Sequence, residues 1–296
     1  MDLQRIFSLK EKELITEITG LIGVGRTDKD NYLYYERPES PILLQAHIDS
    51  LATYNDKYKL RLSNHILRAS GVLGADDRAG VFSLLQITKI CNKKGLILPN
   101  LIFTNYEESG GGGMKAFVKA SKKKDFSHIK IAIAIDRRGC NDYVTYVDID
   151  DEVKKYIEDF GFCSSYGSYN DIKEFSEFTK IPSVNLSCGY YNQHQKDERL
   201  HVDEMELTIK RVVRIIENPI EKLYECRPKW SNNYNWSNRV WSKKLGRYID
   251  SSEEEEEETS RCEICETTSE ITRIYTDGYI MNLCSYCKNT IIDHKC

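Results

Sequence analysis

The sequence has 296 residues, of which 40% are hydrophobic and 30% are charged, and its formal net charge is −4. This near balance excludes the strong basic excess of a nucleic-acid-binding domain, and no apolar run approaches the ~20 residues that span a bilayer. The first eleven residues lack the apolar stretch of a secretory signal, so we expect a cytoplasmic protein whose ten cysteines are thiols or metal ligands rather than disulfides.

Helix and strand patterns alternate along the first 218 residues. A capping box at residues 8–11 precedes apolar residues at helical spacing, and an alternating segment around Ser63-Asn64 indicates a hairpin. The alternation predicts an α/β fold with a largely parallel sheet covered by helices on both faces. The patterns predict strands at 41–46, 101–104, 130–135 and 181–186, a hairpin at 58–70, and helices at about 77–93, 114–122 and 203–217.

Carboxylate and imidazole side chains lie just after the predicted strands or just before the helices that follow them. Ligands of open α/β sheets gather at the carboxyl ends of strands, so we expect these side chains to meet. Imidazole with carboxylates suits Zn²⁺, Mn²⁺ or Co²⁺ better than Ca²⁺ or Cu⁺. The candidates are His47, Asp49, Asp76, Asp77, Glu107, Glu108, Asp136 and His194.

The spacing of these residues suggests which of them bind metal, which orient a ligand and which transfer protons. His47 and Asp49 lie two apart on an extended segment, so Asp49 can accept a hydrogen bond from the imidazole and fix its tautomer. Glu107 and Glu108 are adjacent, so one can bind metal while the other moves protons. Two metals need about six protein contacts, which favours one bridging carboxylate.

A resemblance to the co-catalytic zinc exopeptidases rests on five motifs in order: H-I-D, G-A-D-D-R-A-G, Y-E-E-S-G-G-G-G, A-I-D-R-R-G and Y-N-Q-H-Q-K-D-E. This superfamily includes bacterial tripeptidases, secreted leucyl aminopeptidases and glutamate-releasing carboxypeptidases. The resemblance covers roughly residues 1–218. It implies a doubly wound, mixed and mainly parallel sheet of the phosphorylase/hydrolase type.

The resemblance also implies two metal ions in one active site, namely zinc, with Mn²⁺ or Co²⁺ as alternatives. His47 and Asp136 would bind the first metal, with Asp49 behind His47. Asp76 would bridge the two metals, and Asp77 would support it.

Glu108 and His194 would complete the second metal, and Glu107 would be the general base that activates a metal-bridged water. His201 is a rival to His194, but the H-x-x-x-E run from His194 to Glu198 fits better, so we expect His201 to be a surface residue. The expected activity is a zinc-dependent exopeptidase acting on small peptides, an aminopeptidase or di/tripeptidase. An N-acyl amino-acid amidohydrolase or deacetylase, and a catalytically silent binding protein, remain alternatives.

Residues 136 and 194 are too close in sequence for the dimerisation domain that tripeptidases insert between the corresponding motifs. The chain is therefore more similar to the single-domain aminopeptidases. We expect substrate to bind to loops around 141–146 and 160–171, the second of which carries Tyr166, Tyr169 and Asn170.

The composition changes after residue 218. We predict a catalytic domain at 1–218, a linker with three tryptophans and a six-glutamate run at 219–260, and a zinc-knuckle module at 261–296. The paired C-x-x-C spacing resembles a zinc ribbon with one structural Zn²⁺. Its acidic residues argue against nucleic acid, and residues 226–296 are a candidate site for a protein partner. The predicted ligands are Cys262, Cys265, Cys284 and Cys287.

Overall fold

The computed structural model describes residues 2–228, except 29, 53, 55–57, 123 and 168, together with the backbone of four strands between 239 and 284. Contacts divide the chain into two units, Met1–Trp230 and Ser231–Cys296. The two units are described separately below.

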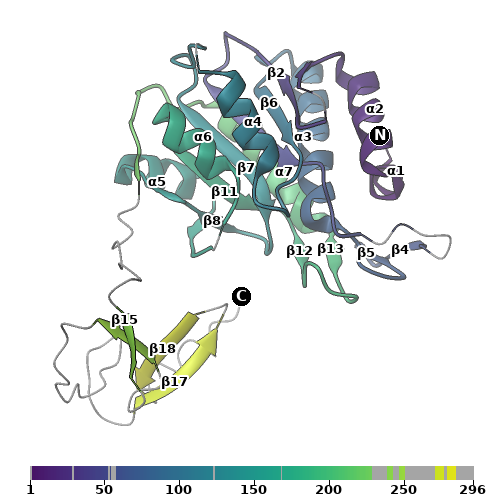
Figure 1. Cartoon of the computed structure of the whole chain (residues 1–296). Coiled ribbons are helices and arrows are strands. Elements are labelled where there is room, and N and C mark those ends of the chain that lie inside the picture. Colours follow the sequence, from purple (N-terminus) through teal and green to yellow (C-terminus); the bar gives the residue numbers. More distant parts are fainter. Residues whose placement is uncertain are drawn as a thin grey trace. The chain divides into compact units, whose positions relative to one another are not determined.

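The first unit is built on a mixed eight-stranded sheet (Figure 1). Its four central strands β6, β3, β7 and β11 are parallel, while β2 and β8 run antiparallel to their central neighbours. The predicted mainly parallel sheet is thereby confirmed. In sheet order the strands are β1 (Arg26–Thr27), β2 (Tyr32–Tyr35), β6 (Asn100–Thr104), β3 (Ile42–His47), β7 (Ile131–Arg137), β11 (Ser183–Ser187), β8 (Asp142–Val144) and β10 (Cys163–Ser164).

Helices cover both faces of this sheet, as expected (Figure 1). Alternate strand residues point to opposite faces, so Leu44 and Ile133 join one apolar core while Leu43 and Ala132 join another. The first core includes residues of α1 (Leu3–Ser8), α2 (Glu11–Ile22), α3 (Ala75–Lys94), α5 (Asp151–Glu158) and α7 (Val202–Glu217). The second includes residues of α4 (Gly112–Ala120) and α6 (Ile172–Thr179).

The predicted capping box at residues 8–11 is wrong. Ser8 is the last residue of α1, and α2 begins after Lys10, whose backbone N–H donates to Glu13 Oε2 at 2.9 Å. A separate short helix therefore occupies the segment that the pattern assigned to the entry of α2. The sequence patterns also missed α5 and α6, which have only eight residues each.

A smaller antiparallel sheet has the order β12-β13-β5-β4. The predicted hairpin is confirmed as β4 (Leu60–Ser63) and β5 (Ile66–Ala69), joined by Asn64 and His65, both with positive φ. The other two strands are β12 (Tyr190–Tyr191) and β13 (Arg199–His201). The turn between β12 and β13 carries His194, so this sheet holds the last predicted motif in place.

The chain continues to pack on the first unit beyond residue 218. Ile220 and Cys226 are buried in its core, and β14 (Arg227–Pro228) pairs with β9 (Val147–Asp148). The predicted domain boundaries at 218 and 260 stay predictions.

The second unit contains two antiparallel hairpins. They are formed by β15 (Arg239–Ser242) with β16 (Arg247–Asp250), and by β17 (Ile271–Thr276) with β18 (Tyr279–Cys284). Of the predicted knuckle ligands, Cys284 ends β18 and only its backbone is described, while Cys262, Cys265 and Cys287 lie outside the described residues. The zinc knuckle therefore stays a prediction.

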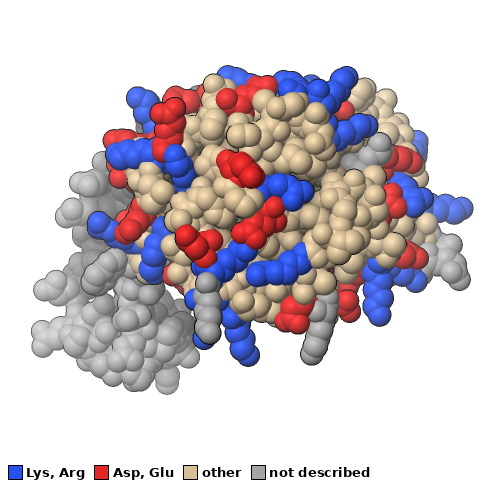
Figure 2. Space-filling model, turned by 90° about the horizontal axis from the view of Figure 1, so that it is seen from above, with Lys and Arg blue, Asp and Glu red and all other residues tan. Residues whose placement is uncertain are grey.

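Charged side chains of both signs are interspersed over the face of the molecule seen in Figure 2. This distribution agrees with the small net charge of −4. Among the described helices, none is long and apolar enough to cross a membrane.

Candidate metal centre

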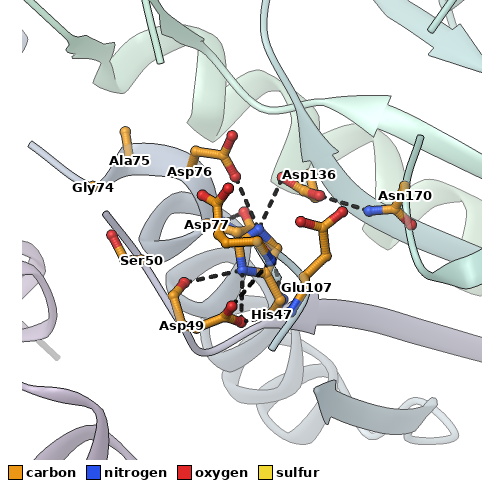
Figure 3. A network of polar contacts seen from close by, with 12 residues as sticks. His47, Asp49, Ser50, Gly74, Ala75, Asp76, Asp77, Glu107, Asp136 and Asn170 are labelled. Atoms are coloured by element: carbon orange, nitrogen blue, oxygen red, sulfur yellow. Dashed lines mark hydrogen bonds and ion pairs between the residues drawn. The ribbon is translucent and has the colours of Figure 1, made fainter. Parts of the chain in front are cut away.

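The predicted site residues meet at the carboxyl ends of the central strands. Figure 3 labels six of them: His47, Asp49, Asp76, Asp77, Glu107 and Asp136. His47 ends β3 and Asp136 lies near the end of β7, while Glu107 and Glu108 lie three and four residues after the end of β6. Asp76 lies in the first turn of α3. Because parallel strands end at the same edge of a sheet, residues from distant parts of the chain converge here.

One group of candidate metal ligands consists of His47, Asp76 and Asp136, whose ligand atoms lie within 4.8 Å of one another. His47 Nε2 lies 2.9 Å from Asp76 Oδ1 and 3.7 Å from Asp136 Oδ1. The His47 side chain is 0% exposed. This group is therefore enclosed by protein.

A second group consists of Asp76, Glu108 and His194, again within 4.8 Å. His194 Nε2 lies 2.8 Å from Glu108 Oε1 and 3.3 Å from Asp76 Oδ2, and its side chain is 37% exposed. Asp76 thus directs one carboxylate oxygen toward His47 and the other toward His194. A carboxylate that bridges two metal ions needs this arrangement.

Asp49 connects the histidine strand to the loop that carries the two glutamates. His47 Nδ1 lies 3.0 Å from the Asp49 carbonyl oxygen and 3.3 Å from Asp49 Oδ1. The backbone N–H groups of Glu107 and Glu108 donate to the Asp49 carboxylate at 3.1 and 3.0 Å. Asp49 therefore lies against the imidazole, at the place where the sequence puts it, and it also anchors the glutamate loop, which the sequence did not indicate.

Asp77 supports the site from beneath. It is fully buried, accepts the backbone N–H of His47 at 3.1 Å, and accepts the N–H of Gly80 at 2.8 Å. The peptide bond between Asp76 and Asp77 is cis. The two adjacent aspartates make different contacts: Asp76 faces the two ligand groups, whereas Asp77 accepts hydrogen bonds from backbone N–H groups.

Asp136 is held by a separate set of polar contacts. Asn170 Nδ2 donates to Asp136 Oδ2 at 2.6 Å, and the Tyr190 hydroxyl donates to Oδ1 at 3.2 Å. Asn185 binds the backbone of Asp136 through both its N–H and its carbonyl oxygen, at 3.0 and 2.7 Å. The sequence placed Asn170 in a substrate-binding loop, but the structure buries its side chain against Asp136 (Figure 3).

Glu198 is the functional candidate whose contacts sequence reasoning missed. It is 1% exposed, and its carboxylate accepts the backbone N–H groups of Gly74, Ala75 and Asp76 at 2.7, 2.9 and 3.3 Å. The H-x-x-x-E spacing was the only signal, and it served to select His194. Because Glu198 fixes the turn that carries Asp76, it acts on both ligand groups.

The charges of these groups perturb one another. Burial raises the pKa of Glu107 to about 8, and the nearby negative charges of Asp171, Asp76 and Glu108 add to this effect. Burial also raises the pKa of Asp136. Hydrogen bonds to Asp76 and Glu108 raise the pKa of His194 to about 10. The protein alone thus concentrates negative charge that a divalent cation would offset.

The donor set fits two divalent cations of the zinc type. Each group offers imidazole and carboxylate ligands, the two groups share Asp76, and further polar residues orient the candidate ligands, as is usual in metal sites. His201, the rival of His194, lies outside both groups, and its Nδ1 is 3.4 Å from Glu204 Oε1.

Solved structures with a similar fold support the architecture. Aminopeptidase PepT from Bacillus cereus ATCC 10987 is 16% identical, with a TM-score of 0.59 over 73% of this chain and 96% of that chain. A tripeptidase from Staphylococcus aureus is 15% identical, with a TM-score of 0.56 over 73% and 96%. The TET1 peptidase of Pyrococcus horikoshii is 16% identical, with a TM-score of 0.54 over 72% and 98%.

A search of curated protein sequences finds no match to the chain. A family model does match it: residues 27–180, just over half of the chain, fit the model of peptidase family M28. This segment contains the first four of the five motifs and ends before His194. The predicted fold and the resemblance to the co-catalytic metallo-exopeptidases are thereby confirmed. The chain belongs to peptidase family M28.

Proposed function

We propose that this chain is a di-metal exopeptidase that cleaves small peptides, as an aminopeptidase or a di/tripeptidase. The observation that carries the proposal is the carboxylate of Asp76, which is shared between two groups of candidate ligands. Membership of a peptidase family supports it. Similar folds in proteins described as an aminopeptidase and a tripeptidase favour exopeptidase action on short substrates.

His47, Asp76 and Asp136 would hold one metal ion, and Asp76, Glu108 and His194 would hold the other. Zinc is the first choice for these ligands, with Mn²⁺ or Co²⁺ as alternatives. When bound, such ions supply Lewis acidity for the substrate carbonyl and lower the pKa of water.

Glu107 is the proposed general base. Peptide hydrolysis needs a group that accepts a proton from the attacking water and returns it to the leaving amine. Glu107 lies beside Asp136 (Figure 3) but belongs to neither ligand group, so its carboxylate is free to carry that proton. The hydrogen bond from its backbone N–H to Asp49 fixes the start of the side chain relative to His47.

The direct test of this role is Glu107→Gln, which keeps the shape of the side chain but removes the base. We expect kcat to fall by about 10²- to 10⁴-fold while the metal content stays unchanged. Glu206→Gln, an exposed glutamate on α7, is the matched control and should leave both unchanged. Full activity of Glu107→Gln would remove Glu107 from the mechanism.

The bond that is cleaved needs its own experiment. The zinc-loaded protein would be screened against free-amino di- and tripeptides and against N-acyl amino acids. Hydrolysis of the free-amino peptides supports the proposal, whereas turnover of N-acyl substrates alone favours the amidohydrolase alternative. Turnover of neither would refute exopeptidase action and favour the silent binding protein.

We make three further proposals, which concern the zinc content of the whole chain, its location in the cell and a protein partner. With two ions in the site and one in the cysteine module, elemental analysis should count about three zinc ions per chain. We also propose a cytoplasmic location and a protein partner for residues 226–296. A pull-down that requires those residues would support the partner, and equal capture after their removal would exclude it.

A further inference from the structure

Arg78 belongs to the G-A-D-D-R-A-G motif but to neither ligand group. Its side chain is fully buried, although a guanidinium stays charged in proteins. Its partners among the described residues are neutral oxygens, namely the carbonyl oxygens of Ile48 and Leu9 and the hydroxyl oxygen of Tyr54. Burying a charge against neutral groups is costly, which favours a role for this arginine beyond filling the core.

Three successive peptide groups of the H-I-D segment are each fixed by a hydrogen bond. The backbone N–H of His47 donates to the Asp77 carboxylate at 3.1 Å, and the N–H of Ile48 donates to the Thr104 carbonyl oxygen at 2.6 Å. The carbonyl oxygen of Ile48 accepts a hydrogen bond from Arg78 Nη1. Two adjacent residues of α3 thus fix the chain just before and just after the point where β3 ends.

The peptide group that Arg78 contacts leads directly into Asp49, which supports both ligand groups. The Asp49 carbonyl oxygen lies 3.0 Å from His47 Nδ1 (Figure 3). The Asp49 carboxylate accepts the backbone N–H groups of Glu107 and Glu108 at 3.1 and 3.0 Å. A shift of this peptide group would therefore move the imidazole and the glutamate loop together.

The other contacts of Arg78 fix the guanidinium itself. Nε donates to the Tyr54 hydroxyl oxygen at 3.2 Å, and Nη2 donates to the carbonyl oxygen of Leu9, between α1 and α2, at 3.2 Å. Each nitrogen atom of the guanidinium thus has an acceptor from a different segment. A lysine presents all its donors from one point, whereas the planar fork of arginine spreads them. The contacts therefore favour arginine over a positive charge alone.

We propose that Arg78 is a positioning residue of the metal centre. By fixing the peptide group between Ile48 and Asp49, it sets the orientation of the His47 imidazole and of the glutamate loop. Its effect on kinetics rests on the proposed exopeptidase function, whereas its effect on the local backbone does not. The two effects can therefore be measured separately.

Amide hydrogen exchange of the metal-free protein tests the effect on the backbone. In Arg78→Lys, which keeps the charge, the N–H groups of Glu107 and Glu108 should exchange about 10- to 100-fold faster, as for the loss of a hydrogen bond from a charged group. The N–H groups of β11 report global unfolding and should stay within about threefold of wild type. An equal increase at both places would mean a purely structural role, and it would overturn the proposal, as would unchanged exchange.

A control and a milder variant accompany this experiment. Arg5→Lys changes an arginine of α1 whose side chain is 58% exposed, and it should alter exchange at neither place. Tyr54→Phe removes only the hydroxyl that accepts from Arg78, so exchange at Glu107 and Glu108 should rise by about 2- to 10-fold. If Arg78→Lys does not fold, Tyr54→Phe decides, and no local increase in that variant would overturn the proposal.

Zinc affinity and steady-state kinetics test the effect on the site. Chelator competition should show that Arg78→Lys binds zinc about 10- to 100-fold more weakly than wild type. At saturating zinc, kcat should fall while KM stays within about threefold, because Arg78 contacts no substrate in this role. If the wild type cleaves no peptide but local exchange and zinc affinity change as expected, the proposed function fails and the positioning role stands. If it cleaves peptides and Arg78→Lys keeps its zinc affinity and kcat, the positioning role is refuted.

Discussion

The two ligand groups of the candidate metal centre share Asp76 but are built differently. His47 and Asp136 lie on the adjacent strands β3 and β7, and the His47 side chain is fully buried. Glu108 and His194 lie on connections outside the sheet, and His194 has a positive φ and a side chain that is 37% exposed. The first group is thus part of the core, whereas the second lies at its surface.

This difference in burial and support predicts how tightly each ligand group binds its metal ion. The strand residues are fixed by the sheet, and Asp49 and Asn170 orient their side chains further. The loop residues have fewer such supports, so ligand exchange and substrate access are easier there. We therefore expect tighter metal binding by the first group than by the second.

The largest effect should come from the residue that both groups share. Asp76→Asn keeps the size of the side chain but removes its charge, so both ions should be lost and peptide hydrolysis should fall below detection. Elemental analysis would show a loss of about two zinc ions per chain relative to wild type. Asp203→Asn, an exposed aspartate paired with His65, is the control and should retain all of them. An Asp76→Asn protein that keeps two ions would disprove the bridge.

The next effect distinguishes the two groups from each other. His47→Ala should lower the free energy of unfolding of the metal-free protein by about 3 kcal/mol, because it leaves the buried carboxylates of Asp76 and Asp136 without their imidazole. His194→Ala should cost less than about 1 kcal/mol, since His194 is more than a third exposed. Denaturant unfolding in the presence of a chelator measures both. Equal losses would break the distinction between a buried and a surface group.

A smaller effect is expected at Glu198, which acts through the turn that carries Asp76. Glu198→Gln turns one acceptor into a donor that faces backbone N–H groups, so the turn should loosen and affinity for both ions should fall by about 10- to 100-fold. Chelator competition measures the two affinities. If only the second site weakens, the turn is not common to both groups. Unchanged affinities would assign Glu198 a purely structural role.

The last effect concerns how the stability of the protein depends on pH through a carboxyl group beneath the site. Asp171 is fully buried, accepts a hydrogen bond from Gln45 at 2.8 Å, and has a second oxygen without a partner. Burial raises its pKa to about 6, so the folded state binds its proton more tightly than the unfolded state does. The stability that this proton provides is complete below about pH 4 and is lost as the pH rises through 6.

Asp171→Asn should therefore stabilise the protein at pH 8, by up to about 3 kcal/mol, and not at pH 4. Urea unfolding of the metal-free protein at the two pH values provides the measurement. A gain of equal size at both values would mean that the charge of Asp171 is not the cause.

The sequence by itself determined the α/β class, most elements of the central sheet and the residues of both ligand groups. It could do so because strand periodicity is local and because parallel strands deliver their last residues to one edge. His47 and Asp136 needed no further information than their places at strand ends. The family match and the similar folds agree with the predicted fold.

Only the tertiary structure decided which side chains support those ligands. Glu198 reaches the turn at 74–76, and the side chain of Asn170 is buried against Asp136. These contacts join residues that are 34 and 123 positions apart, and a hydrogen bond leaves no periodic signal in the chain. Local sequence patterns therefore identify the candidate ligands, whereas the contacts that orient them depend on how the connections fold back over the sheet.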